Sequence, residues 1–163
     1  MSFGEGSGTD YATARGRDWP SIRQFNVFLA NRLGAMMNLV RRFESSDVRV
    51  VSLTVVDSAD CAIIRLVPSD PERAVEILEQ AKLPYTESDL LAVQLPDSKQ
   101  PLMAICKTLL TAEINIHYAY PLLGVGPLGN THALALHVDD QDTAAATLTE
   151  KGFTILTEGD LNA

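Results

Sequence analysis

In the first half of the chain, segments whose apolar residues have the spacing of a strand alternate with segments whose apolar residues have the spacing of a helix. Four apolar side chains between Met36 and Phe43 recur at i, i+3, i+4 and i+7, which places them on one face of a helix. Val48–Val56 is rich in β-branched residues, which favour strands. The whole pattern predicts strands at 22–29, 48–56 and 61–67 and from Tyr85 on, with helices over 35–44 and from Pro71 to the turn before Pro84.

The second half of the chain repeats this order of elements. The pattern predicts a strand at 90–95, a helix with the apolar stripe Leu102, Ile105, Cys106 and Leu109, strands at 114–120 and 131–138, a helix opened by Asp140, and a last strand at 153–157. Equivalent positions lie 66 residues apart, as in Asn31 and Asp97, Gly34 and Gln100, and Val48 and Ile114. Such internal similarity indicates two copies of one structural unit.

Two βαββαβ units predict an α+β fold of two ferredoxin-like sheets in tandem, paired side by side with helices on one face of the sheets. We assign residues 1–20, which are rich in Gly, Ser and Thr, to a loosely ordered N-terminal arm. Residues 21–88 form the first predicted domain and residues 89–163 the second. Because a unit of about 65 residues has a small core, we expect the two sheets to stabilise each other by pairing edges or by stacking.

Local helix signals support these assignments. Asp70 has the character of an N-cap and Pro71 that of a first helical residue, and Asp140 is the equivalent cap in the second half. Asn31 is a turn and N-cap residue before the first helix, and Gly34 permits a positive φ. On the predicted strand 114–120, strict alternation places Ile114, Ile116, Tyr118 and Tyr120 on one side and Asn115 and His117 on the other.

The charge and composition of the chain exclude some classes of protein. The formal net charge is −8 and the pI is near 4.7, which argues against binding to nucleic acid. No apolar run approaches the roughly 20 residues of a membrane span, and the N-terminus lacks the features of a secretory signal. Cys61 and Cys106 are expected to be buried small apolar residues in a reducing compartment, which predicts a cytoplasmic protein.

The residues that could support catalysis or metal binding are poorly placed for it. Cys106 is not accompanied by a His–Asp pair, and His132 and His137 fall on opposite faces of one strand, although His117 could approach one of them across the hairpin. The Gly-rich stretch 124–129 lies inside a hairpin, and the acidic run 139–142 opens a helix. We therefore predict no catalytic residue, no metal site and no cofactor.

The stretch 30–36, a strand end followed by a short turn and a helix start, has two interpretations. It is an ordinary strand-to-helix turn, or it is a site where backbone N–H groups hold a small anion such as the carboxylate of an amino acid. In the second repeat, Lys99 and Gln100 replace Leu33 and Gly34, so the first turn is expected to be the better site. Tyr118 and Tyr120 also have two interpretations, packing against the sheet or forming the wall of a pocket.

The turn at 31–36, followed by a helix and a Val-rich strand, resembles the small ligand-binding ACT domain, and so does the run 111–120. The resemblance covers about residues 21–158 and is strongest to free-standing bacterial proteins with two ACT domains in tandem. It implies domains that pair into an eight-stranded sheet and bind amino acids at the domain interface. By this resemblance, the ligand-binding residues are Asn31, Arg32, Leu33, Gly34 and Ala35 of one domain and Asn115, Ile116, His117 and Tyr118 of a partnered domain.

Two functional hypotheses follow. The first is a non-catalytic regulatory protein, expected to be a homodimer, that binds an amino acid or related metabolite and signals through domain arrangement to a metabolic enzyme or regulator. The second is a ligand-free protein–protein interaction module built on the paired sheets. An enzyme such as acetolactate synthase is disfavoured, because the two repeats fill residues 21–158.

Overall fold

The computed structural model describes residues 20–126 and 128–162, so the predicted N-terminal arm lies outside the described residues except for Pro20. The elements, in chain order, are β1 (Ile22–Ala30), α1 (Ala35–Glu44), β2 (Val50–Asp57), β3 (Cys61–Pro68), α2 (Pro71–Gln80), β4 (Tyr85–Gln94), α3 (Pro101–Thr111), β5 (Ile116–Val125), β6 (Thr131–Val138), α4 (Gln141–Glu150), β7 (Ile155–Leu156) and α5 (Glu158–Leu161). This order confirms the predicted α+β fold of two βαββαβ units. No helix in the described part is long and apolar enough to cross a membrane.

Strand β4 belongs to both units. Its first part, Tyr85–Leu90, pairs with β1, and its second part, Leu91–Gln94, pairs with β6. The two strands predicted around residues 85 and 90–95 are therefore one continuous strand. Because β4 is shared, the two units form one seven-stranded antiparallel sheet in the order β2-β3-β1-β4-β6-β5, with β7 paired to β4.

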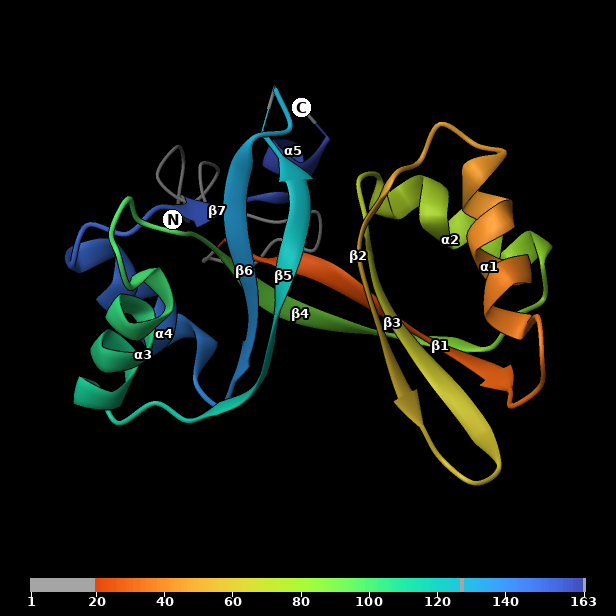
Figure 1. The fold of residues 1–163 in the computed structure, drawn as a ribbon, viewed down its shortest axis with the longest axis horizontal. Helices are drawn as coiled ribbons and strands as arrows, with labels where there is room; N and C mark the ends of the chain where they lie inside the picture. Colours follow the sequence, from red (N-terminus) through yellow and green to blue (C-terminus); the bar gives the residue numbers. More distant parts are fainter. Residues whose placement is uncertain (1–19, 127, 163) are drawn as a thin grey trace, which may run out of the picture.

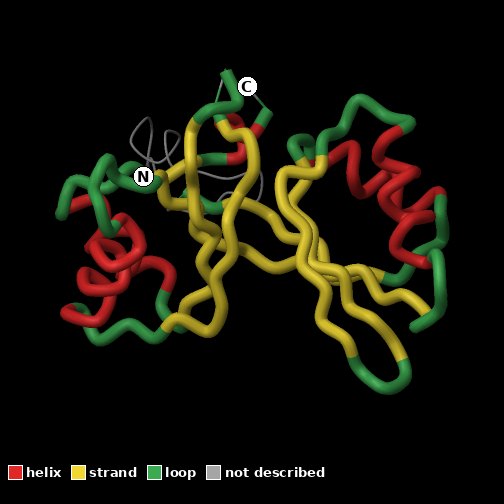
Figure 2. Tube along the Cα trace, viewed as in Figure 1, coloured by secondary structure: helices red, strands yellow, loops and turns green. Residues whose placement is uncertain are grey.

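The sheet lies between two pairs of helices. Figure 1 shows α1 and α2 on one side of the molecule and α3 and α4 on the other, and Figure 2 shows the strands between them. One core lies between α1, α2 and their strands around Phe25 and Phe43, and a second lies around Leu91 and Ile105 under α3 and α4. A third core, which includes Leu90, packs the helix-free faces of the two units against each other. The expected mutual stabilisation of the sheets thus occurs through this central core and through β4.

The predicted helix caps of the second helix of each unit are confirmed. Asp70 accepts a hydrogen bond from the backbone N–H of Arg73 (3.2 Å), and Asp140 accepts one from Thr143 (3.0 Å). These bonds satisfy N–H groups that a helix start otherwise leaves unpaired. Pro71 occupies the first turn of α2, as expected from its fixed φ.

The prediction for the two cysteines was wrong. Cys106 is exposed and Cys61 is partly exposed, and both are free. On α3 only Ile105 and Leu109 of the predicted stripe are buried, because the helix contacts the sheet and α4 through a narrow strip. Leu102 is 51% exposed, so half of the predicted apolar stripe faces outward.

A β-bulge corrects the predicted facing of β5. Ile116 pairs with Val138 but Tyr118 pairs with His137, so the extra residue His117 is accommodated on β5 only. After the bulge, the side chains of β5 face the opposite sides of the sheet from those that strict alternation from Ile116 predicts. As a result Ile116 packs with the helices of the second unit, whereas Tyr118 and Tyr120 face the central core.

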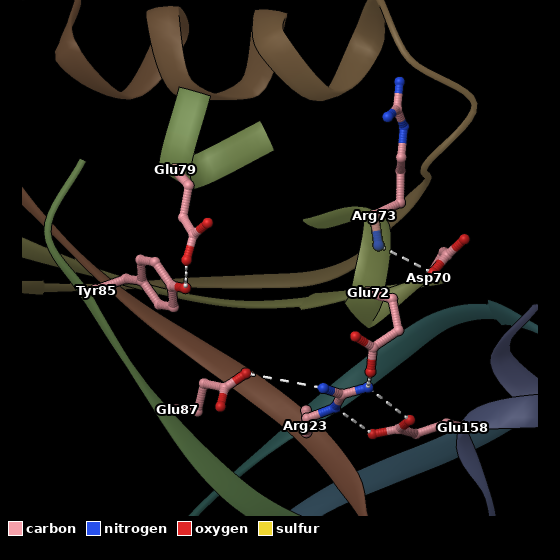
Figure 3. Close-up of polar contacts among 8 residues, drawn as sticks. All are labelled: Arg23, Asp70, Glu72, Arg73, Glu79, Tyr85, Glu87 and Glu158. Carbon is pink, nitrogen blue, oxygen red and sulfur yellow. Dashed lines mark hydrogen bonds and ion pairs between the residues drawn. The ribbon is translucent and has the colours of Figure 1, made fainter. Parts of the chain in front are cut away.

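Arg23 joins the C-terminal helix α5 to the first unit (Figure 3). Its side chain is only 7% exposed, and it donates to Glu158 of α5 (2.8 Å) and to Glu72 of α2 (2.6 Å). Glu87 of β4 lies 3.9 Å away and adds a third carboxylate. Burial lowers the pKa of the Arg23 guanidinium, but the hydrogen bonds to Glu158 and Glu72 outweigh it and hold that pKa above its ordinary value.

Replacing Glu158 by Ala is expected to lower the free energy of unfolding by about 1–3 kcal/mol, because a nearly buried guanidinium loses two hydrogen bonds to a carboxylate. The matched control is Glu76→Ala, which breaks the exposed Arg73–Glu76 pair on α2 and should cost no more than about 0.5 kcal/mol. Urea denaturation of both variants measures the difference. Equal losses in the two variants would contradict the role assigned to Arg23.

Candidate functional site

The turn between β1 and α1 has the left-handed backbone that its glycine allows. Gly34 is the N-cap of α1 with φ 85° and ψ −8°, and no side chain caps the helix start. Leu33 is fully exposed. The backbone of the turn is held by a hydrogen bond from Arg32 N–H to the Ala30 carbonyl (2.9 Å). The turn therefore leaves N–H groups at the start of α1 without a side-chain partner, as an anion site requires.

Asn31 is not the N-cap that the sequence suggested. Its side-chain amide donates to Asp57 Oδ1 (3.1 Å) and to the Ser58 carbonyl (3.3 Å). Both acceptors lie at the end of the β2–β3 hairpin, since β2 ends at Asp57. Asn31 therefore ties the turn to the hairpin, and Gly34, three residues later, takes the cap position.

Two cavities flank this turn. The first, which we call the β2-side cavity, has a volume of about 310 Å³ and lies between the turn and the β2–β3 hairpin. It is lined by Leu29, Ala30, Asn31, Arg32, Ala35, Met36, Val55, Asp57, Ala62 and Ile64. The second, the α2-side cavity, has a volume of about 390 Å³ and lies between α1, the end of β1 and the turn that follows α2. Both volumes are within the range of small-molecule sites.

The equivalent turn of the second unit has a different backbone. Gln100 takes the place of Gly34 with φ −133°, and Pro101 begins α3. A cavity of about 670 Å³ lies beside this turn, bounded by Asp97, His132, Lys151 and Phe153 among others. The larger cavity is thus found at the turn for which the sequence predicted the weaker site.

The predicted ligand residues form two separate groups within one chain. Asn31, Arg32 and Ala35 line the β2-side cavity, while Leu33 points into solvent and Gly34 shapes the backbone. The second group, residues 115–118, lies at the start of β5 in the other unit. In Figure 1 the turn after β1 and the start of β5 lie on opposite sides of the molecule, so a single chain does not bring the two groups together.

The second group belongs partly to a polar cluster at the junction of the units. Gln24 of β1 is fully buried, and its amide donates to Tyr118 (3.0 Å) and to Asn26 (2.7 Å). Its oxygen accepts a hydrogen bond from Tyr120 (2.5 Å). The amide of Asn26 in turn donates to Ser88 of β4 (3.0 Å). Burial, and then the neighbouring Tyr118, raise the pKa of Tyr120 above its ordinary value, so it remains a hydrogen-bond donor.

Planar side chains extend this cluster along β5 and β6. The Arg65 guanidinium lies 4.0 Å from the centre of the Tyr118 ring, and the His137 ring stacks on Tyr118 at 4.8 Å with an interplanar angle of 6°. His117 approaches His137 at 5.4 Å, as the sequence suggested for two strands of one hairpin. Because Arg65 comes from the first unit and the rings from the second, these contacts hold the units together.

Sequence reasoning missed Gln24, Asn26 and Arg65. The available signal was the occurrence of Gln24 and Asn26 at alternate positions of β1, which places two polar side chains on one face of the strand. That signal does not identify their partners, because Tyr118 reaches them only through the bulge at His117. Within the described residues, no group of three or more His, Cys, Asp or Glu side chains could hold a metal ion.

The protonation of His137 links stability to pH. Burial first, and then the nearby His117 and Arg65, lower the pKa of His137 below its ordinary value of 6.5. A histidine that favours its neutral form in the fold is protonated more readily in the unfolded chain, so its contribution to stability is lost as the pH falls below 6.5.

Replacing His137 by Gln should therefore flatten the decrease in unfolding free energy between about pH 7.5 and 5.5. The loss of the ring lowers stability at every pH, so the slope with pH is the relevant measurement. His132→Gln, on the same strand but exposed, is the matched control and should retain the wild-type slope. A wild-type slope in the His137 variant would show that another group causes the pH dependence.

Comparisons with known proteins agree with this architecture. The chain is similar to the solved structure of protein BT0572 from Bacteroides thetaiotaomicron, with a TM-score of 0.77, 21% identity, and coverage of 87% of this chain and 96% of that chain. It is also similar to the regulatory subunit of aspartate kinase from Thermus thermophilus in its ligand-free form, with a TM-score of 0.52, 9% identity, and coverage of 80% and 91%. At these identities the likeness shows the fold. A search of curated proteins finds no match.

The family comparison covers all the described residues. A model of the ACT domain pair matches residues 20–163, which include both units and the strand that they share. The chain therefore belongs to the ACT domain pair family.

Proposed function

We propose that this protein is a regulatory module that binds an amino acid or a similar small metabolite in the β2-side cavity and responds through the arrangement of its subunits. The observation that carries the proposal is the Asn31–Ala35 turn, whose uncapped helix start borders a cavity of about 310 Å³. ACT domain pairs are typically regulatory and bind small molecules, which agrees with this geometry.

The energetics favour a site completed by a second element. A helix N-terminus contributes roughly 0.3–1 kcal/mol to a bound anion, and each charge-assisted hydrogen bond adds about 1.5–3 kcal/mol. Micromolar affinity needs about −8 kcal/mol, which the turn alone does not supply. Strand β2 is an edge of the sheet, and its residue Val55 is 47% exposed beside the cavity, so a further chain has access to it.

A second copy of the chain is a suitable source of the missing contacts. Strand β5 is the other edge of the sheet, and Asn115 and His117 at its start are exposed. If the edge β5 of one copy lies beside the edge β2 of another, residues 115–118 approach the β2-side cavity of that copy. The ligand would then contact two subunits, and its binding would be coupled to dimer formation.

A protein–protein interaction module remains the second candidate, and the exposed apolar surface of α3 favours it. Met103 is 63% and Leu110 is 76% exposed, in addition to Leu102. Exposed apolar residues gathered on one helix are typical of a surface that binds another protein. This candidate requires no response to a small ligand.

A thermal-shift screen of the twenty amino acids at millimolar concentration tests the proposed function. Binding to the folded state at a hundred times Kd stabilises it by about 2.7 kcal/mol, which gives a clear rise in Tm. Gly34→Val should abolish the rise, because valine does not hold φ 85° and the turn must rearrange. Gly152→Val is the matched control, since Gly152 has φ 90° and equally open surroundings but lies in the other unit.

Two results of this screen would contradict the proposed function. If no amino acid raises Tm, or if the Gly34 variant responds like the wild type, the β2-side cavity is not the proposed site. Sedimentation with and without the active amino acid adds a second measurement. A shift toward the dimer is expected only for proteins that retain the thermal response.

A further inference from the structure

The α2-side cavity is a separate space on the other side of the β1–α1 turn. Its apolar floor consists of residues from the end of β1, from α1 and from the turn after α2, namely Phe28, Leu29, Leu39, Leu83 and Pro84. Leu29 and Leu39 are buried, so this floor is part of the core of the first unit. An apolar floor lowers the local dielectric and strengthens any ionic interaction made above it.

The polar lining of this cavity is cationic. Arg32 enters from the turn and Arg42 from the last turn of α1, with the amide of Asn38 between them along the helix. The described residues that line the cavity include no carboxylate. Arg32 and Arg42 are exposed, so water screens the repulsion between their charges, and an anion bound between them would neutralise it.

These two guanidiniums differ from other arginines of the protein. Arg23 and Arg73 pair with glutamates, Arg49 donates to backbone carbonyls, and Arg65 lies over the Tyr118 ring. The guanidiniums of Arg32, Arg41 and Arg42, by contrast, are exposed and have neither a hydrogen bond nor an ion pair within the described part of the chain, and of these three only Arg32 and Arg42 line the α2-side cavity. In a protein with 21 acidic and 13 basic residues, two arginines that line one cavity without a carboxylate beside them form a candidate site for an anion.

Stabilisation of the helix end accounts for only part of this arrangement. Arg41 and Arg42 both lie in the last turn of α1, where a cation is favoured by the helix dipole. Either residue serves that purpose, and Arg41 does not line the cavity. The dipole also does not explain Arg32, which precedes the helix.

The second unit lacks both guanidiniums at the equivalent positions. At the offset of 66 residues, Ser98 corresponds to Arg32 and Thr108 to Arg42. The corresponding cavity of about 670 Å³ contains Asp97 together with Lys151 and His132, so its charges are mixed. The cationic lining is therefore a property of the first unit and not of the shared architecture.

We propose that the α2-side cavity binds a small dianion, a dicarboxylate or a phosphate-bearing metabolite, between Arg32 and Arg42. Each guanidinium donates to a negatively charged oxygen, for which its planar fork is well suited. The amide of Asn38, between the two arginines along the helix, would bind a polar group of the ligand. The apolar floor would contact the carbon skeleton of the ligand. This site lies on the other side of the β1–α1 turn from the β2-side cavity, with which it shares Arg32, and it requires no second copy of the chain.

Titration calorimetry of the full chain with succinate and with inorganic phosphate tests this proposal. It also distinguishes a dicarboxylate ligand from a phosphate-bearing one. Acetate, a monoanion, and sodium chloride at matched ionic strength are the control ligands. Succinate or phosphate should bind, and Arg42→Ala should weaken binding about tenfold or more, as the loss of one charge-assisted hydrogen bond implies. Arg41→Ala, which removes the same charge from the adjacent position, should bind as the wild type does.

Other outcomes overturn the proposal. These are the absence of binding by both dianions, equal binding of acetate, or equal losses in the Arg41 and Arg42 variants, which would indicate unspecific attraction. Arg42→Gln retains the length of the side chain and provides a second variant if the alanine variant fails to fold. The amino-acid response of the Arg42 variants in the thermal-shift screen should be unchanged, so this proposal and the proposed function can fail independently.

Discussion

The sharing of strand β4 is the constraint on which the rest of the structure depends. One strand serves as the last strand of the first unit and the first strand of the second, so the two sheets cannot separate without breaking its hydrogen bonds. The same strand contributes Leu90 and Ala92 to the central core and Ser88 to the polar cluster at the junction. The proposed small-molecule control is therefore expected to act at the turns and the sheet edges, because the junction is held by the central core and by β4.

The two units share one backbone irregularity although the side chains around it differ. Each second strand has a bulge at the same place, at Val51 in β2 and at His117 in β5, which are 66 residues apart. The residue after the bulge faces the other unit in both cases. Ser52 donates to the Pro121 carbonyl (2.7 Å), whereas the equivalent Tyr118 reaches Gln24. At the bulge equivalent backbones thus carry different side chains, whereas the turns at Gly34 and Gln100 differ in backbone as well.

The sequence predicted those parts of the fold that depend on local interactions. Asp70 and Pro71 determine a helix start within four residues, and the repeat gave the order of the elements. The merging of two strands into β4 was missed because pairing partners decide where a strand ends, and those partners are distant in the chain. The bulge at His117 was missed for the same reason, since alternation within one strand cannot reveal an extra residue relative to its neighbour.

Site residues were harder to predict than the fold. The sequence identified the turn at Asn31–Ala35, and the structure adds that Asn31 binds the β2–β3 hairpin instead of capping α1. For Arg42 the local sequence favours a solvated helix face, because Arg41 and Arg42 are adjacent and end a helix. Only the packing of α1 against the turn after α2 separates them, by bringing Arg42 and not Arg41 to the α2-side cavity.

Arg32 makes the two proposed sites interdependent, because it lines both cavities that flank the turn. One guanidinium cannot donate its full set of hydrogen bonds on both sides of the turn at once. A dianion that holds Arg32 in the α2-side cavity withdraws a cation from the β2-side cavity and so weakens the binding of a carboxylate there. By thermodynamic linkage, a ligand of the β2-side cavity must weaken binding of the dianion by the same factor. If both sites bind as proposed, the first unit therefore integrates two metabolite signals through one side chain, without any rearrangement of the shared strand.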